Sequence, residues 1–431
     1  MLNLLLITWA LFAGLLMTRV TNIFKLPDVT AYLIVGVIIG PSILGKLGIE
    51  GVGFINFEEV ESLSIISDVA LGFIAFAIGN EFKISEIKHI GKQAFIIGVF
   101  QAMVATFCVD VTLILLHIVM PEIVTIPMAL LLGAIAAATA PAATLMVIKQ
   151  YKAKGPVTDI LLPVVALDDA VGLMIFAVSF GVAESLISGD TNIVNLIVEP
   201  LMEIVLSLLL GSIVAMILSF LENYFHSNSN RLVLIIASII LTVAIAKVSF
   251  KFGRFAGSFS PLLVCMMLGT VFCNICPLSD DLMDRASSWS QPILVLFFVL
   301  SGAELDLAVF KNPVVVLIGI IYILARSFGK YIGARISATM AGSIEVVRKY
   351  LGITLLPQAG VALGMSAIVA TSLGEHGTLI RNITLFGVLI YELIGPTLTK
   401  IALTKAGDIK EKPKEVIERR ENKLKNANKN F

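Results

Sequence analysis

Two adjacent carboxylates, Asp168 and Asp169, lie in the middle of the apolar segment 157–183. An ionised carboxylate at the centre of a bilayer costs about 2.5–3.5 kcal/mol on insertion scales, so charged groups inside a membrane are usually functional. Neighbouring residues on a helix point about 100° apart, so both side chains reach one water-filled cavity only if they straddle its wall. Because like charges this close oppose each other's ionisation, a proton and a monovalent cation can compete for the pair. The pair therefore predicts a site that binds a cation and a proton.

A further charged residue, Lys330, falls deep in the apolar segment 313–337. It shares a helix face with Gly329 and Gly333, and small residues of this kind allow a neighbouring helix to approach closely. A buried ammonium group needs an anionic partner, and one of the two adjacent carboxylates is the obvious candidate. We therefore expect this segment to pack beside the carboxylate pair.

Five other charged residues fall within apolar segments: Asp110, Glu304, Asp306, Arg326 and Glu392. For Asp306 and Arg326 we expect a structural ion pair or a side chain that extends to the membrane interface. For Asp110 and Glu392 the sequence leaves functional and structural roles equally open.

Two apolar segments contain helix-breaking residues at corresponding places. Pro141 stands within the small-residue stretch 133–144, while Pro357 and Gly360 interrupt the stretch 356–364. A proline inside a helix lacks an N–H donor and clashes with the carbonyl four residues before it. The two stretches are seven predicted spans apart and therefore run in opposite directions, a pattern that indicates a transporter with inverted-topology repeats. We expect their half-helix ends to face each other near the middle of the membrane.

The composition places these segments in a membrane protein. Of the 431 residues, 58% are hydrophobic and only 14% are charged, whereas soluble proteins carry about 25% charged residues. A soluble core could not hide this much apolar surface, which excludes a soluble enzyme. Apolar runs recur that are long enough to cross about 30 Å of hydrocarbon, without the alternation of a β-barrel. We predict an all-α integral membrane protein with about 13 transmembrane helices, at 2–18, 29–46, 61–79, 93–119, 124–148, 157–183, 199–222, 231–250, 256–273, 291–310, 313–337, 348–373 and 379–400.

The distribution of basic residues predicts the orientation. Loops on one side of the predicted membrane carry 12 Lys and Arg residues, against 6 on the other side. Cytoplasmic loops are the basic ones, so the N-terminus is expected outside and the C-terminus inside. Residues 406–431 form a basic cytoplasmic tail that is too polar to build a core and too short for a nucleotide-binding domain. Membrane lipid is an expected partner of the tail, whereas a net charge of zero gives no reason to expect nucleic acid.

An ordered set of features resembles the monovalent cation/proton antiporter superfamily, whose members have the Na+/H+ exchanger fold. In chain order these features are Gly36-x-x-x-Gly40-Pro-Ser-Ile-Leu-Gly45, Thr139-Ala-Pro141, Asp168-Asp169, Gly329-Lys330-x-x-Gly333 and Pro357. The resemblance covers residues 1 to about 405 and implies inverted repeats with two crossing broken helices. It also implies a homodimer, with a mobile core domain from spans near 93–183 and 313–400 and a dimerisation domain from the remaining spans.

The resemblance implies roles for individual residues. Asp169 is expected to bind the cation, with Asp168 and Thr139 completing the Na+ site near the crossing. Asp168 is expected to form an ion pair with Lys330. A pair of Asp residues together with this Lys resembles the electrogenic branch, which exchanges two protons for one Na+, and we expect Lys330 to carry one of the two protons. One residue departs from the pattern, because Gln358 stands where many relatives have Arg.

We therefore predict a secondary antiporter that exchanges Na+, and Li+ as a second substrate, for protons across the cytoplasmic membrane. We expect no enzymatic activity and no cofactor. Exchange of K+ for protons and Na+-coupled symport of an organic solute are the alternatives. An intramembrane aspartyl protease needs Asp residues that face each other from two helices, and here they are adjacent on one. A channel fits the paired broken helices less well than alternating access does.

Overall fold

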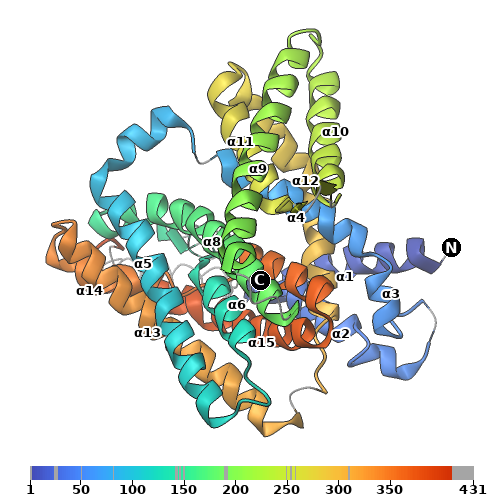
Figure 1. Ribbon diagram of the computed structural model, residues 1–431, viewed down its shortest axis with the longest axis vertical. Coiled ribbons are helices and arrows are strands. Elements are labelled where there is room, and N and C mark those ends of the chain that lie inside the picture. Colours follow the sequence, from blue (N-terminus) through green and yellow to red (C-terminus); the bar gives the residue numbers. More distant parts are fainter. Residues whose placement is uncertain are drawn as a thin grey trace, which may run out of the picture.

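The computed structural model describes most of the chain as helices (Figure 1). The described residues are 2–23, 28–49, 51–80, 82–140, 144, 147–148, 151–188, 193–248, 250–252, 255–257, 259–308 and 311–409.

The helices form two packed groups. The first group consists of α1 (Leu2–Ile23), α2 (Asp28–Ile39), η1 (Leu44–Leu47), α3 (Phe57–Glu61), α4 (Ser64–Asn80), α9 (Ile193–Glu222), α10 (Asn228–Ala246), α11 (Pro261–Ile275) and α12 (Ser279–Ala303). The second group consists of α5 (Ile84–Val119), α6 (Ile126–Ala137), α8 (Pro156–Ser188), α13 (Pro313–Met340), α14 (Glu345–Thr354) and α15 (Gly360–Ala406). A short antiparallel hairpin of β1 (Phe250–Phe252) and β2 (Phe255–Gly257) connects α10 to α11.

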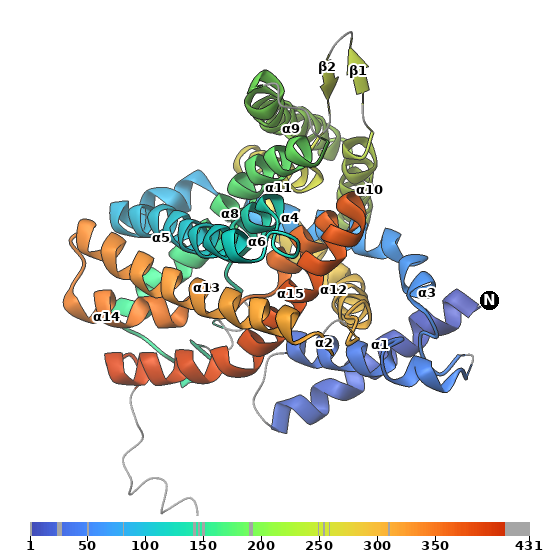
Figure 2. The same cartoon turned by 60° about the horizontal axis from the view of Figure 1, so that its bottom comes forward.

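Packing within each group is more extensive than packing between them. In the second group α13 lies along α5, and α6 packs on both α5 and α8. In the first group α11 packs on α4 and α9, while α12 packs on α2 and α4. The groups meet where α15 contacts α2, α4 and α12, near the centre of Figure 1, and where α8 continues toward α9. Figure 2 shows α13 and α14 at the left of the molecule and α9, α10 and α11 toward its top, with α15 running through the middle.

Two glycines set the distance between α13 and α5. A Cβ atom at Gly329 would stand 2.9 Å from Cα of Ala105, and one at Gly333 would stand 3.0 Å from the carbonyl oxygen of Gln101. Side-chain carbon atoms essentially never come that close to backbone, so only glycine permits this approach. The contact places Lys330, between the two glycines on α13, directly against α5.

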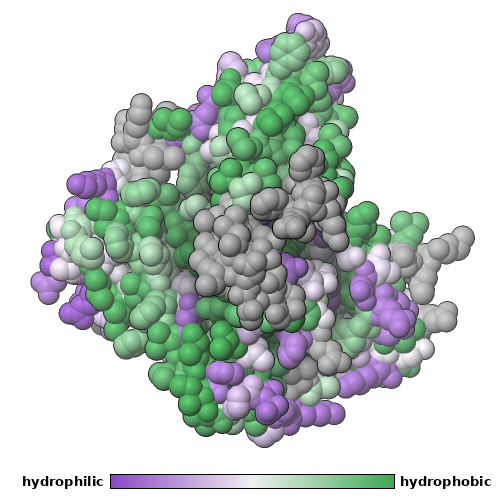
Figure 3. Space-filling view, in the orientation of Figure 1, coloured by the Kyte–Doolittle hydropathy of each residue, from purple (hydrophilic) through white to green (hydrophobic). Residues whose placement is uncertain are grey.

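Among the described residues on the face shown in Figure 3, hydrophobic side chains predominate, and hydrophilic ones gather mainly toward its edges. Within the described residues, nine helices are long and apolar enough to cross a membrane, and four shorter apolar helices accompany them. Large hydrophobic side chains such as Leu4, Phe107, Phe220 and Leu324 are exposed on the helices that form the exterior. Such a surface is stable only against hydrocarbon, so the protein is a multi-pass membrane protein.

The helices follow the predicted spans, with differences at helix ends. The segment 256–273 was predicted as one span, but its helix begins only at Pro261 because β2 occupies the preceding residues. The segment 348–373 contains two helices, α14 and the first part of α15, separated at the predicted break. α15 then runs through the last predicted span, with a non-helical residue at Gly374 (φ 56°, ψ −129°). The helical fold is confirmed, whereas the count of 13 spans stays a prediction.

Candidate functional site

The two interrupted segments meet in the structure. After α6 the chain becomes extended at Ala138 (φ −64°, ψ 142°), and the N–H of Ala140 donates to the carbonyl of Pro357 over 2.9 Å. A proline lacks an N–H donor and clashes with the carbonyl four residues before it, here that of Ala137, so the presence of Pro141 in the sequence accounts for the end of α6. Pro141 itself lies outside the described residues. The break after α14 and the break after α6 therefore cross through a direct backbone hydrogen bond.

The end of α6 is capped by side chains from elsewhere in the chain. The last four carbonyls of a helix lack partners within it, and here they belong to residues 135–138. Gln358 Nε2 donates to the carbonyl of Ile135 over 2.9 Å. Arg326 donates to the carbonyl of Ala136 through Nε over 3.0 Å and to that of Ala138 through Nη2 over 2.7 Å. Lys330 Nζ donates to the carbonyl of Ala137. Two positive charges thus stand at the negative end of this helix dipole.

Arg326 also joins the two crossing segments. Its Nη1 donates to the carbonyl of Leu356 over 2.7 Å, and its guanidinium stacks on the ring of Tyr391 with 4.5 Å to the ring centroid. The side chain is fully buried, so it does not extend to the membrane interface. Its structural role depends on backbone carbonyls and not on a carboxylate. Gln358 lies beside it and also hydrogen-bonds the hydroxyl of Tyr322.

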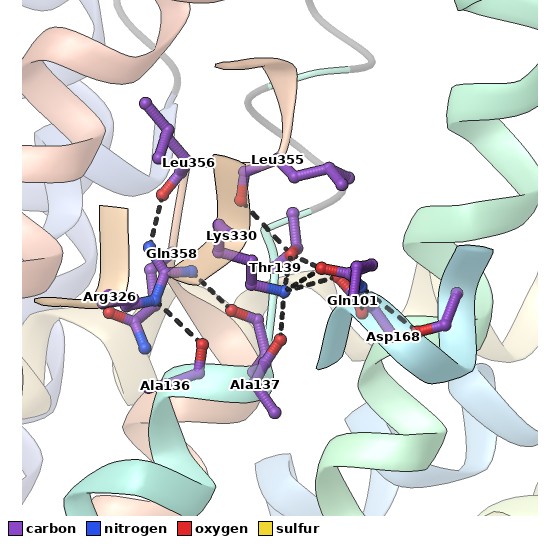
Figure 4. Close-up of polar contacts among 12 residues, drawn as sticks. Gln101, Ala136, Ala137, Thr139, Asp168, Arg326, Lys330, Leu355, Leu356 and Gln358 are labelled. Carbon is purple, nitrogen blue, oxygen red and sulfur yellow. Dashed lines mark hydrogen bonds and ion pairs between the residues drawn. The ribbon is translucent and has the colours of Figure 1, made fainter. Parts of the chain in front are cut away.

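Asp168 and Lys330 form an ion pair next to the crossing (Figure 4). Lys330 Nζ lies 2.7 Å from Asp168 Oδ2, and both side chains are fully buried. The hydroxyl of Thr139 donates to the same Oδ2 over 2.5 Å and lies 2.9 Å from Lys330 Nζ, as its acceptor. A buried ion pair is stable only when its remaining donors and acceptors are satisfied, and Thr139 supplies part of that need.

Gln101 on α5 completes this network. Its Oε1 accepts a hydrogen bond from Lys330 Nζ over 3.1 Å, and its Nε2 donates to Asp168 Oδ1. Its side chain is fully buried. The amide therefore contacts both members of the ion pair, with its oxygen toward the cation and its nitrogen toward the anion (Figure 4).

Asp169 faces a different environment. It lines a cavity of about 830 Å³ between the two helix groups, which is bounded by α2, α4, α8, α12 and the start of α15. The described lining includes the carboxylates of Asp28, Asp169 and Asp284, but neither Lys nor Arg. Thr144, which follows the break in the first crossing segment, also lines it. Carboxylates without a neighbouring basic side chain in the described lining attract cations, and Asp169 is the member of the pair that lines this cavity.

Other intramembrane charges lie where α15 meets the first helix group. Glu392 is buried and its Oε2 accepts from the hydroxyl of Thr30 over 3.2 Å. Glu304, at the end of α12, forms an ion pair with Arg381 of α15. The side chain of Asp306 caps the following turn by accepting from the N–H of residue 308 over 2.8 Å. The contacts of Glu392 with Thr30 and of Arg381 with Glu304 connect α15 to the first helix group.

The structure brings together most of the residues expected from the sequence. Asp168, Lys330 and Thr139 share one network, and Gln358 lies at the crossing. Sequence reasoning did not single out Gln101, although a carboxamide in the otherwise apolar stretch 94–105 was a usable signal. The direct role of Arg326 at the crossing was also missed, because backbone carbonyls leave no mark in the sequence.

Comparison with known proteins agrees with this geometry. The family model described as "Sodium/hydrogen exchanger, transmembrane" matches residues 7–405. The high-affinity Na+/H+ antiporter NhaS3 of Synechocystis is 25% identical over 321 residues, which cover 73% of this chain and 66% of that protein. Na+/H+ antiporter 1 of Methanocaldococcus jannaschii is 26% identical over 404 residues, which cover 90% of this chain and 86% of that protein.

A solved structure shares the fold. The sodium proton antiporter MjNhaP1 from Methanocaldococcus jannaschii at pH 8 superposes with a TM-score of 0.70 and 21% sequence identity, covering 93% of this chain and 97% of that chain. The fold, the crossing of two broken helices and the family match over residues 7–405 lead to one assignment. The chain belongs to the sodium/hydrogen exchanger family of the monovalent cation/proton antiporter superfamily.

Proposed function

We propose that the protein is a secondary antiporter that exchanges Na+ for protons across the cytoplasmic membrane by alternating access. One observation carries the proposal. Asp168 is held in a buried ion pair with Lys330, while its neighbour Asp169 lines an acidic cavity. A cation that enters the cavity meets one carboxylate directly and can recruit the second only by breaking the ion pair. Relatives that are named as Na+/H+ antiporters support Na+ as the substrate.

The exchange follows from this division of roles. Asp169 holds a proton until Na+ displaces it, since the two compete for the same oxygens. Asp168 then turns toward the ion, with Thr139 as a third oxygen ligand. Lys330 loses its only ionic partner in the network and gives up its own proton. Two protons leave for each Na+ that binds, so the cycle moves net charge, and a 100 mV potential contributes about 2.3 kcal/mol per elementary charge. We expect Li+ to use the same ligands.

From the position of the cavity we infer the side of the membrane to which the site opens in this structure. Its lining includes Asp28 at the start of α2, Asn80 at the end of α4, and Asp284 near the start of α12. These helix ends adjoin the loops that carry the larger share of Lys and Arg, which we assign to the cytoplasm. The structure then corresponds to an inward-open state, with the N-terminus outside and the C-terminus inside. On the opposite side α15 is joined to α12 by the ion pair of Arg381 and Glu304.

The two helix groups supply the parts for alternating access. We propose that α5, α6, α8, α13, α14 and α15 form the mobile core, since they hold the crossing and the ion pair. The remaining helices form the dimerisation domain of a homodimer in membrane lipid. Packing between the groups is limited, chiefly to α8 and α15, and this permits one group to move relative to the other.

The proposal is tested by proton flux in proteoliposomes. Purified protein is reconstituted with a pH-sensitive dye inside, and Na+, Li+ or K+ is added in turn to the outside. We expect Na+ and Li+ to drive proton movement and K+ to drive little. Proton movement driven by K+ and not by Na+ would identify a K+/H+ antiporter, and uptake of a labelled solute without proton exchange would identify a symporter.

A further inference from the structure

We propose that Gln101 is a positioning residue that restrains Asp168 and so keeps the affinity for the transported cation low enough for rapid release. The inference rests on the proposed function, because it concerns the same exchange site. It assigns to α5 a part in transport that goes beyond helix packing.

The orientation of the Gln101 amide is fixed by its neighbours. Nε2 donates to Asp168 Oδ1 and lies 3.2 Å from the carbonyl oxygen of Gly98, while Oε1 accepts from Lys330 Nζ over 3.1 Å. A flipped amide would place its oxygen against two acceptor oxygens and its nitrogen against an ammonium group, which only donates. The glycine contact of Gly333 against α5 holds the backbone of Gln101 in place.

The two oxygens of Asp168 therefore have separate partners. Oδ2 accepts from Lys330 and Thr139, and Oδ1 accepts from Gln101. Lone pairs on Oδ1 that would bind a cation are used by the amide N–H. A cation at Asp169 must compete with this hydrogen bond before Asp168 can turn toward it.

The direction in which removal of the amide changes the cation affinity can be predicted. A buried carboxylate oxygen that loses its hydrogen bond is strongly destabilised, because charged groups lose more than neutral ones when left unsatisfied. A cation would then restore the missing interaction, so the protein should bind cations more tightly. Tighter binding in the ground state slows release, so the turnover rate should fall together with the KM.

Two other roles for Gln101 predict different results. If Oε1 were itself a ligand of the cation, removal would weaken binding and raise the KM. If Gln101 were only a packing residue, a substitution of similar volume would leave the KM unchanged and lower the rate only through reduced stability.

The test is the KM for Na+ and the kcat of Gln101→Met in proteoliposomes at a fixed pH. Methionine keeps the length and volume of the side chain but cannot hydrogen-bond Asp168. We expect the KM to fall about tenfold, with a lower kcat, since a hydrogen bond to a charged group corresponds to at least about a tenfold change in affinity. An unchanged or raised KM overturns the proposal.

Two further variants keep the test decisive. Gln101→Asn retains the amide on a shorter side chain that cannot span both partners, and it should lower the KM by less than Gln101→Met. If Gln101→Met does not fold, a KM for Gln101→Asn equal to that of the wild type overturns the proposal. Gln93→Met is the matched control, because Gln93 is exposed near the start of the same helix and outside the ion-pair network, and its KM should equal that of the wild type. Absence of Na+-driven flux in the wild type would refute the proposed function, whereas an active wild type with unchanged variants refutes this inference alone.

Discussion

The ammonium nitrogen of Lys330 lies 2.7 Å from Oδ2 of Asp168, and neither side chain is accessible to solvent. The nitrogen is also within hydrogen-bonding distance of Gln101, Thr139 and the carbonyl of Ala137. Three neutral oxygens therefore surround it besides the carboxylate. Once the ion pair breaks and the proton leaves, the neutral amine can still donate its two N–H groups to these oxygens, which suits a group that must lose and regain a charge in each transport cycle.

Replacement of this lysine tests its part in charge movement. We expect Lys330→Gln to be inactive or to exchange ions without net charge, because one of the two proton carriers is gone. The measurement is the reversal potential of Na+-driven current in reconstituted vesicles. If the variant still drives a current with the reversal potential of the wild type, Lys330 only stabilises the fold, and the second proton comes from another group, with Asp168 the next candidate.

Arg326 is expected to be essential for stability. Arg326→Met would leave three buried carbonyls at the crossing without their donor. Each unsatisfied buried polar group costs about 1–3 kcal/mol, so the variant should lose at least about 3 kcal/mol of stability. The check is the midpoint of thermal unfolding in detergent. Arg335→Met, on the exposed side of the same helix, is the control and should unfold close to the wild-type temperature. Equal midpoints for both variants would show that the carbonyls find other donors.

The boundary between the fold and the tail can be placed by truncation. Asp408 is buried, and its Oδ2 accepts from the N–H of Thr158 over 2.7 Å and from its hydroxyl over 2.8 Å. It thus caps the start of α8, the helix that carries Asp168 and Asp169. We expect truncation after Ile409 to preserve transport, because the residues beyond it are too polar to form a core.

Truncation after Lys405 should be damaging, because it also removes this cap. Loss of an N-terminal helix cap costs about 0.5–2 kcal/mol, and Asp408→Ala in the full-length chain should reproduce much of the effect. Thermal unfolding and Na+-driven flux of the two truncations provide the comparison. Loss of transport on truncation after Ile409, at unchanged expression, would show that the tail regulates the transporter.

The apparent affinity for Na+ should depend on pH. Na+ binding is proposed to displace one proton from Asp169 and one from Lys330, so acidification raises the KM for Na+ and alkalinisation lowers it until both groups have lost their protons. In the acidic range, where both groups hold a proton before Na+ binds, release of two protons changes the KM by up to about a hundredfold per pH unit. Initial rates over a range of Na+ concentrations at several pH values measure this slope. A KM that is the same at acidic and alkaline pH would contradict competition.

Charge made part of this site predictable from the sequence. A carboxylate pair or a lysine in an apolar span is conspicuous because burial of an unpaired charge is costly. Pro141 and Pro357 marked the crossing because proline breaks a helix locally. Gln101 and Arg326 act through contacts between helices far apart in the chain, and an amide or a backbone carbonyl carries no charge that demands a partner. The predicted spans 231–250 and 256–273 each overlapped one end of the β1–β2 hairpin, because averaged hydrophobicity does not separate a short apolar strand from a helix end.

Alternate binding of Na+ and a proton by Asp169 is tested most directly by comparing two equal substitutions on one helix. Asp169→Asn removes the carboxylate in the cavity, while Asp159→Asn makes the same change at the exposed start of α8. Both proteins are reconstituted, and Na+-driven proton release is measured with an entrapped pH dye. We expect Asp169→Asn to be folded but inactive, and Asp159→Asn to exchange Na+ for protons at the wild-type rate. Exchange at the wild-type rate by purified Asp169→Asn would show that Asp169 is not the residue that binds Na+ and a proton in alternation.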